Sequence, residues 1–489
     1  MRQLLVESAL LAALGCVAGL ILASTGPNIV RSLLPAEFPQ LHALTIDGRV
    51  LVFSLIVSAL TALGFGLVPA WQMRGVVLND ALKQSAATGS ARVQVHRLRA
   101  GLVIAEFAFT MVLLAGAGLL IKSFFTLRNV ALGFEPRQLL TACVELPQRA
   151  YPTPQRRLAF QRELIERIQA LPGVQCAGII SRLPLSGGNI GGLLEIEGLP
   201  APEFKPGGEM RAAGIRSVSP DYFRAMGIPL RRGRALADTD RETTQPVALI
   251  NEAMARKYWP NEEAIGRRVK PTIMDLPWLE IIGVVGDVRH QGLDQRPDPE
   301  LYVAAAQSPP SQVNLVVRTA PGPATVAASI RRVVSDLDSD QPVYRLLSME
   351  KLLADASAAP RFRTVLLSAF GGLALLLAAV GIYGVMSFSV AQRTQEIGIR
   401  MALGAQRGDV LRLIVRQGIR LVAAGGAIGI VAAFALTRLL RGFLYEVAPT
   451  DPGTLVTVAA VLATVGVFAC WLPARRATKV DPMEALRYE

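Results

Sequence analysis

Residues 364–391 read TVLLSAFGGLALLLAAVGIYGVMSFSVA, a stretch without a single Asp, Glu, Lys or Arg. A helix needs roughly 20 apolar residues to cross the hydrocarbon core of a bilayer, so this stretch is predicted to span a membrane. Four further stretches have the same character, and a fifth is interrupted only by Glu106: 8–30, 50–73, 421–437, 452–474 and 100–121. The sequence therefore predicts a polytopic α-helical membrane protein with about six transmembrane helices.

The overall composition agrees with a membrane protein. Of the 489 residues, 51% are hydrophobic and only 18% are charged, against about 25% in ordinary soluble domains, and the mean hydropathy is +0.39. The formal net charge of +13 would suggest nucleic acid in a soluble protein. Aromatic residues make up only 6%, however, and no basic run is interleaved with Phe or Tyr. We therefore expect no nucleic-acid partner and assign the positive charge to loops on the cytoplasmic side.

The region between the third and fourth spans has the composition of a folded aqueous domain. Residues 155–171 carry apolar side chains on one helical face and stop at Pro172-Gly173, which predicts a helix. Short apolar runs at 174–180, 247–250, 281–285 and 315–317 are typical of strands. We expect one large mixed α/β domain over 123–362.

The distribution of Lys and Arg predicts the orientation. The basic segments beside the spans are 74–99, 391–420 and the tail 475–489, which predicts that all three are cytoplasmic. Alternating six spans from a cytoplasmic start then places the less basic loops and the 123–362 domain on the outside. The C-terminus is expected in the cytoplasm.

The chain contains an internal repeat. A shift of 410 residues aligns Arg2 with Arg412 and also Gly15 and Gly19 with Gly425 and Gly429, and beyond the loop a shift of 404 aligns 69–70 with 473–474. A pair of spans with its loop and its basic exit therefore occurs twice. The second copy is preceded by a span, an aqueous domain and another span, whereas nothing precedes Met1. We therefore expect the first copy to be truncated: the chain is a fragment of a longer protein, or it borrows the missing spans from a partner.

The glycines of the repeat are candidates for helix packing. Gly15 and Gly19, like Gly425 and Gly429, lie four residues apart and form the small-xxx-small surface that lets membrane helices approach closely. A sliding or dimer interface is the functional alternative to simple packing. Glu106 is predicted to lie roughly 9 Å inside its span, where it pairs with an Arg or reaches the interface; a proton relay is the alternative.

The segment 393–405, RTQEIGIRMALGA, is the most informative motif. Glu396 and Arg400 are spaced to pair on one helical face, while Ile397 and Met401 line a neighbouring face. Such a helix can lie along the membrane and offer an apolar ridge to a cytoplasmic partner. A basic loop that is merely solvated at the inner leaflet is the alternative.

Several motifs together carry a family resemblance. Segment 393–405 resembles the cytoplasmic coupling segment of MacB/FtsX-type ABC transporter permeases, and so do LPARRA at 472–477 and DPMEAL at 481–486. The stretches VSPDYF, MGIPL, RGR, VALINE and VVGDV, which start at 218, 226, 232, 247 and 284, look like the MacB-like periplasmic core domain. The duplicated arrangement is similar to the acidobacterial duplicated orphan permease branch.

The resemblance implies a domain plan in the inner membrane of a bacterium. Its parts are the last two transmembrane helices of a truncated first permease unit (1–73), a basic cytoplasmic linker (74–99), a transmembrane helix (100–122), the periplasmic domain (123–362), a transmembrane helix (363–391), the coupling segment (392–411), two transmembrane helices with a short periplasmic loop (412–474) and the cytoplasmic tail (475–489). The site residues that it implies for ATPase coupling are Arg393, Glu396, Ile397, Gly398, Arg400, Met401 and Gly404.

The resemblance also implies a mechanism and partners. A separate ABC ATPase moves the coupling segment, and the motion reaches the periplasmic domain, which is mechanotransmission for export of a substrate that the sequence does not name. Expected partners are that ATPase, membrane lipid, and a second permease or the missing N-terminal half. An FtsX-like scaffold that regulates a periplasmic cell-wall enzyme is the alternative, and a membrane enzyme is a third possibility.

Features of an enzyme are missing from the sequence. It contains no Gly-x-x-x-x-Gly-Lys-Ser/Thr loop, so ATP is expected to act only through the partner ATPase and no cofactor is expected on this chain. No metal or catalytic motif is present, and His42, His96 and His290 are far apart in the sequence. Cys143 and Cys176 share the outside domain, and the sequence leaves open whether they form a disulfide.

Overall fold

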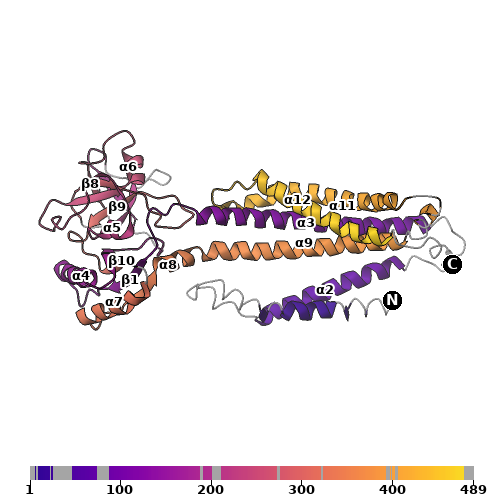
Figure 1. Cartoon of the computed structure of the whole chain (residues 1–489), viewed down its shortest axis with the longest axis horizontal. Helices are drawn as coiled ribbons and strands as arrows, with labels where there is room; N and C mark the ends of the chain where they lie inside the picture. Colours follow the sequence, from indigo (N-terminus) through magenta and orange to yellow (C-terminus); the bar gives the residue numbers. More distant parts are fainter. Residues whose placement is uncertain are drawn as a thin grey trace. The chain divides into compact units, whose positions relative to one another are not determined.

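The chain folds into two units. The computed structural model describes residues 6, 9–10, 12–21, 24–25, 47–73, 88–187, 191–200, 211–272, 276–320, 323–392, 397, 399–401, 403 and 406–477. One unit, here called the helix unit, comprises Met1–Arg128 and Ala358–Glu489, and the other, here called the α/β domain, comprises Asn129–Ser357. The α/β domain is therefore inserted into the helix unit between two of its helices (Figure 1).

Four helices are long and apolar enough to cross a membrane. Within the described residues they are Arg99–Arg128, Ala358–Gln392, Arg407–Phe443 and Pro452–Arg476. The two N-terminal stretches predicted as spans contain shorter apolar helices, Ala12–Ile21 and Gly48–Leu60, the second inside helix α2 (Gly48–Met73). The prediction of a polytopic α-helical membrane protein is thus confirmed, with four spans rather than six among the described residues.

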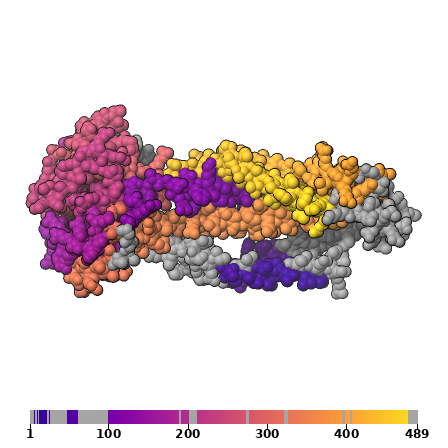
Figure 2. All heavy atoms as spheres, viewed as in Figure 1, coloured from indigo at the N-terminus to yellow at the C-terminus, as the bar shows by residue number. Residues whose placement is uncertain are grey.

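Helices α3 and α9 of the helix unit run antiparallel. The elements of this unit are α3 (Thr88–Arg128), α9 (Ala358–Gln392), α11 (Arg407–Leu436), its 3₁₀ continuation η2 (Thr437–Phe443) and α12 (Pro452–Ala477). The Thr364 hydroxyl donates to the carbonyl of Leu120, and the Thr110 hydroxyl donates 3.2 Å to the carbonyl of Ala374. Residues further along α3 therefore contact residues earlier in α9, as expected of antiparallel helices. Figures 1 and 2 show the helices side by side, α3 in purple and α12 in yellow.

Glycines of α11 bring its backbone close to α3. A Cβ atom added at Gly425 would lie 2.6 Å from the Cβ of Phe107 and 2.8 Å from the carbonyl oxygen of Ile104. At Gly429 it would lie 2.6 Å from the Cβ of Met111. Only glycine fits at these separations, and without a hydrophobic driving force in lipid such close contacts supply the packing energy.

The matching glycines of the first repeat are placed differently. A Cβ atom added at Gly15 or Gly19 would meet no described atom within 4 Å. The packing expected for the repeat is therefore seen in the second copy only, within the described part of the chain.

One eleven-stranded sheet runs through the α/β domain, and it begins with a section of four antiparallel strands. Its strand order is β11-β1-β10-β2, with bounds Tyr344–Ser348, Leu139–Glu145, Gln312–Thr319 and Val174–Ile180. Helices α4 (Pro154–Gln169) and α7 (Pro323–Leu337) cover one face through a shared apolar core. The predicted helix at 155–171 and strand at 174–180 are confirmed.

A closed ring of six strands forms the rest of the domain. The ring order is β4-β3-β7-β8-β6-β9, and β9 returns to pair with β4 in parallel. The bounds are Ala212–Val218, Gly191–Ile196, Arg268–Pro271, Leu279–Val285, Val247–Asn251 and Glu300–Ala304. A short strand β5 (Leu230–Gly233) pairs with β8, and the helices α5 (Tyr222–Met226), α6 (Glu252–Tyr258) and α8 (Met349–Ala356) pack around the sheets. The expectation of a mixed α/β domain is confirmed.

A buried ion pair joins the two strands that close the ring. Arg216 on β4 donates through Nε to Glu300 Oε2 at 2.8 Å and through Nη2 to Oε1 at 3.1 Å, and both side chains are at most 2% exposed. Gly214 leaves the room that this carboxylate needs, since a Cβ there would lie 2.4 Å from Glu300 Oε2. His290 Nε2 lies 3.1 Å from the hydroxyl of Tyr302 in the same cluster. Burial first, and then the positive charge of Arg216, hold the pKa of His290 well below its ordinary value.

Replacing Gly425 by Ala should loosen the helix unit. The new methyl group would overlap the backbone of α3, which costs about 1–3 kcal/mol for overpacking. The neighbouring Gly426→Ala change is the matched control, because a Cβ at Gly426 meets no described atom within 4 Å. Thermal unfolding of the detergent-purified chain should show a lower midpoint for Gly425→Ala alone. Equal midpoints for both variants would contradict the packing.

Acid should weaken the ring through His290. The unfolded chain takes up a proton on this residue near pH 6.5, whereas the folded chain keeps it neutral, so the stability is fully present above that pH and falls as the pH drops below it. From pH 7.5 to 5.5 the loss is about 1.4 kcal/mol for this one group. Hydrogen exchange of the β4 and β9 amides should record it, and His290→Gln should remove that share of the pH dependence. An unchanged pH dependence in the variant would refute the assignment.

Candidate functional site

The predicted coupling segment connects α9 to α11. Its described residues Ile397 and Ile399–Met401 are helical, and Leu403 follows in a turn. Helix α11 begins after Gln406, whose backbone N–H donates 3.2 Å to the carboxylate of Asp409. Asp409 thus caps the first turn of α11 and fixes the point where the segment ends.

Ile397 faces the helix unit and not a partner. Its side chain is 7% exposed and belongs to a core with residues from four helices, among them Phe107 of α3, Met386 of α9, Val410 of α11 and Ala474 of α12. Met401 packs against the same core. The coupling role expected for Ile397 and Met401 stays a prediction, and Ile397 itself is buried within the helix unit rather than on an exposed ridge. Burial of Ile397, with Met401 partly buried beside the same core, removes apolar surface from water and holds the segment to the helices.

The opposite side of the segment is exposed. Leu403 is 83% exposed, Ile399 is 44% exposed, and Arg400 is exposed beside them. The sequence contained a signal for this side: residues 399 and 403 share the same four-residue spacing as 397 and 401, and pattern alone does not say which pair is buried. Four of the predicted site residues lie outside the described residues: Arg393, Glu396, Gly398 and Gly404. The predicted pair of Glu396 with Arg400 therefore lies outside them as well.

Aromatic and arginine contacts tie the helix ends together beside this segment. The guanidinium of Arg99 on α3 lies 3.9 Å from the ring centroid of Phe388 on α9. Arg476 at the end of α12 donates 2.8 Å to the hydroxyl of Tyr383 on α9. Together with the core around Ile397, these contacts connect α3, α9, α11 and α12 at one end. A displacement of the segment would therefore move several helices at once.

Glu106 lies inside its span at about the depth that the sequence predicted. The span covers Arg99–Arg128, so Glu106 lies seven residues, roughly 10 Å, from its start, compared with the roughly 9 Å predicted. One of its carboxylate oxygens would lie 2.2 Å from a Cβ atom added at Gly381 of α9. Within the described residues Glu106 makes no ion pair, so the expected pairing with an Arg is not found there. Its carboxylate instead fills the space that glycine leaves on α9.

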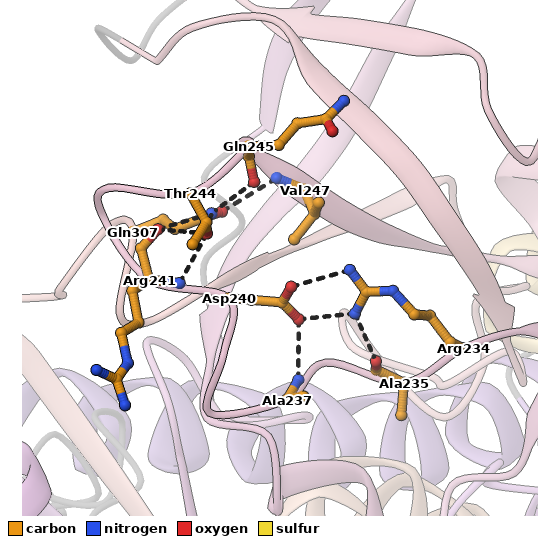
Figure 3. A network of polar contacts seen from close by, with 9 residues as sticks. All are labelled: Arg234, Ala235, Ala237, Asp240, Arg241, Thr244, Gln245, Val247 and Gln307. Atoms are coloured by element: carbon orange, nitrogen blue, oxygen red, sulfur yellow. Dashed lines mark hydrogen bonds and ion pairs between the residues drawn. The ribbon is translucent and has the colours of Figure 1, made fainter.

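A polar network stabilises one loop of the α/β domain (Figure 3). Arg234 donates to both carboxylate oxygens of Asp240 at 2.9 Å. Burial acts to raise the pKa of Asp240, but the hydrogen bonds from Arg234 and the backbone of Ala237 lower it below its usual value. The side chain of Gln307 bridges the other end of the loop, to the backbones of Arg241, Gln245 and Val247. The charges of Arg234 and Asp240 are therefore paired with each other, and the network fixes the shape of the loop.

A surface hollow of about 540 Å³ lies between β5 and α6. Its charged lining is compensated: Arg231 lies 3.6 Å from Glu252, and Arg232 lies 3.7 Å from Glu263. The hollow therefore offers no excess charge that would select a ligand. Among the described residues, no group of three or more His, Cys, Asp or Glu is placed to hold a metal ion.

Cys143 and Cys176 are not bonded. Cys143 lies on β1 and Cys176 on β2, and β10 runs between these strands. Their partners on β10, Asn314 and Arg318, are four residues apart. Two strand spacings alone amount to roughly 9–10 Å, and a disulfide requires Cα atoms within about 7 Å. The sequence left open whether Cys143 and Cys176 form a disulfide, and the strand order shows that they do not.

Two family models match the chain. The MacB-like periplasmic core domain matches residues 100–333, and the FtsX-like permease C-terminal model matches residues 368–482. The first takes in the span of α3 and most of the α/β domain, and the second takes in the coupling segment with α11 and α12.

Curated relatives have names of the same kind. The chain is 29% identical over 321 residues to the uncharacterized ABC transporter permease YknZ of Bacillus subtilis, which covers 62% of this chain and 78% of that protein. It is 28% identical over 287 residues to the macrolide export ATP-binding/permease protein MacB of Chromobacterium violaceum, covering 57% of this chain and 44% of MacB. It is 26% identical over 297 residues to the pyoverdine export ATP-binding/permease protein PvdT of Pseudomonas syringae, and the match covers 57% of this chain and 45% of PvdT. The chain thus spans less than half the length of MacB and PvdT.

The solved structures that resemble this chain include the periplasmic region of MacB from Actinobacillus actinomycetemcomitans. The two share 13% identity with a TM-score of 0.32, and the match covers 47% of this chain and 96% of the solved one. The extracellular domain of YknZ is a second, with 15% identity and a TM-score of 0.29 over 42% and 100%. The family models rest on the sequence itself, and together they take in the α/β domain and the helices that follow it. The chain belongs to the MacB/FtsX-type family of ABC transporter permeases.

Proposed function

We propose that the chain is the permease subunit of a MacB-type ABC transport system that exports a substrate. A separate ATPase would hydrolyse ATP, and the permease would convert its movement into movement of the α/β domain. The family supports a permease, and relatives named for macrolide and pyoverdine export support an exporter. The substrate of this chain is a separate question, since those names belong to other proteins.

One observation carries the mechanism. Ile397 belongs to a buried core that α3, α9, α11 and α12 share, so a push on the coupling segment would act on this core. The α/β domain is inserted between α3 and α9, which means that its two chain connections are the outer ends of these helices. Thr110 and Glu106 of α3 contact α9 directly. Motion at the segment would therefore reach both connections.

We propose the following topology for this permease. The basic ends of the helices face the cytoplasm, the α/β domain lies in the periplasm, and the tail 475–489 is cytoplasmic. Residues 1–73 would add two spans of a first permease unit, 74–99 would link it to the second, and six spans would result. The internal repeat supports this topology. It also supports a place for the chain in the duplicated branch of the family.

The docking side of the coupling segment would be the face that carries Ile399, Arg400 and Leu403. Leu403 is 83% exposed and therefore loses little buried surface on substitution. Apolar side chains at four-residue spacing with a charge beside them are the pattern by which a helix docks in the groove of another protein.

Leu403→Asp should detach the ATPase without unfolding the permease. We would purify the chain from membranes of its native host in mild detergent and measure the ATPase polypeptide and ATP hydrolysis that accompany it. We expect at least a tenfold loss of both for Leu403→Asp, because a carboxylate would be placed in an apolar contact. Leu199→Asp is the matched control, since Leu199 is 52% exposed in the α/β domain. Equal recovery of ATPase with both variants would overturn the docking role.

A further inference from the structure

Two exposed arginines of α11 lie level with the apolar part of α12. Arg416 and Arg420 are both exposed and lie four residues apart, so they share one side of the helix. The opposite side, with Ile414, Gly418 and Val422, is buried against the other helices. The two guanidinium groups therefore face away from the helix unit.

The depth of these arginines follows from the contacts of α11 with α12. A Cβ atom added at Gly418 would lie 2.2 Å from Cys470 Sγ, and one at Gly466 would lie 2.7 Å from a methyl group of Val422. Residue 420 is therefore level with the middle of 466–470. The apolar sequence of α12 continues from there to Ala474 before the first basic residue, Arg475. At 1.5 Å per residue, Arg420 lies roughly 10 Å and Arg416 roughly 4 Å on the apolar side of Arg475.

Neither arginine has a protein partner in the described part of the chain. Arg416 and Arg420 make no ion pair or hydrogen bond there, whereas Arg99 is stacked on Phe388. The nearest described acid on α11 is Asp409, and its carboxylate accepts the N–H of Gln406. Two positive charges beside apolar surface at a helix end attract an anion, because a guanidinium is more stable beside a negative charge than among acyl chains.

The surroundings suit a lipid and not a free ion. Leu413 is 47% exposed and Ile419 is 42% exposed next to the arginines, so apolar and cationic groups share one surface. A phospholipid satisfies both, with its phosphate on the guanidinium groups and its acyl chains on the leucine and isoleucine. A zwitterionic headgroup would bring its own ammonium group towards two arginines, whereas a headgroup with net negative charge would not.

We propose that Arg416 and Arg420, with Leu413 and Ile419, form a binding site for an anionic phospholipid on α11. The arginines hold the phosphate through paired N–H groups, and the lipid fills the outer side of the helix next to the coupling segment. The site does not depend on an ATPase, so its failure would leave the proposed transport function untouched.

Native mass spectrometry of the delipidated full-length chain tests the site. Phosphatidylglycerol and phosphatidylcholine with the same acyl chains would be titrated, and we expect at least tenfold tighter binding of phosphatidylglycerol. The Arg416→Gln/Arg420→Gln double variant should lose this preference. The matched control is Arg438→Gln/Arg441→Gln, which removes two exposed arginines from the other end of the same helix and should keep it.

Further measurements distinguish a bound anionic lipid from a bound free phosphate and from unspecific lipid binding. Equal affinity for the two lipids, or a preference that survives in the Arg416→Gln/Arg420→Gln variant, would overturn the proposal. Inorganic phosphate should not compete with phosphatidylglycerol at equal concentration, and effective competition would reject a lipid as the occupant. If the double Gln variant fails to fold, Arg416→Lys/Arg420→Lys keeps the charges but loses the paired N–H geometry. This variant should show a preference reduced several-fold, and an unchanged preference would contradict the phosphate contact.

Discussion

The close approach of α11 to α3 is the constraint on which the helix unit depends. At Gly425 and Gly429 the two backbones meet with no room for a side chain. In a bilayer, apolar side chains gain little by leaving lipid for protein, so helix association relies on such tight contact. The same contact places the first turns of α11 beside α12 and sets the position of the coupling segment. The proposed coupling would depend on this close packing, because loosely packed helices would absorb the movement.

The α/β domain obtains its stiffness in another way. Its ring of strands closes through the parallel pairing of β4 with β9, and the bidentate pair of Arg216 and Glu300 lies at that closure. A buried ion pair adds little net stability, because removing both charges from water is costly, but loss of either partner would leave an unpaired buried charge. The closure is therefore specific for one register.

The sequence predicted the parts of the chain that depend on local patterns. Apolar length revealed the spans, and periodicity revealed α4 and β2, because both signals lie within one element. The short strands β3, β7 and β9 were missed, since they are defined by pairing with strands far away in the sequence. Arg216 and Glu300 were missed for the same reason: they lie 84 residues apart and become neighbours only through the ring.

The candidate site shows the same division. An amphipathic segment at 393–405 was predictable from spacing, but the side that faces the helices was not, because Ile397 and Leu403 are equally apolar. The depth of Glu106 in its span was predictable from apolar length. Its neighbour Gly381 on α9 was not, because only the fold brings the two helices together.

The central claim is that nucleotide-driven movement at the coupling segment reaches the two connections to the α/β domain. The most direct measurement is the distance between spin labels at Arg128 and Arg361, two exposed positions near the ends of α3 and α9. Pulsed electron spin resonance on the permease with its ATPase, without nucleotide and with ATP trapped by vanadate, would report this distance. The account predicts that trapping shifts the distance distribution. An identical distribution in both states, with the ATPase bound and active, would contradict it.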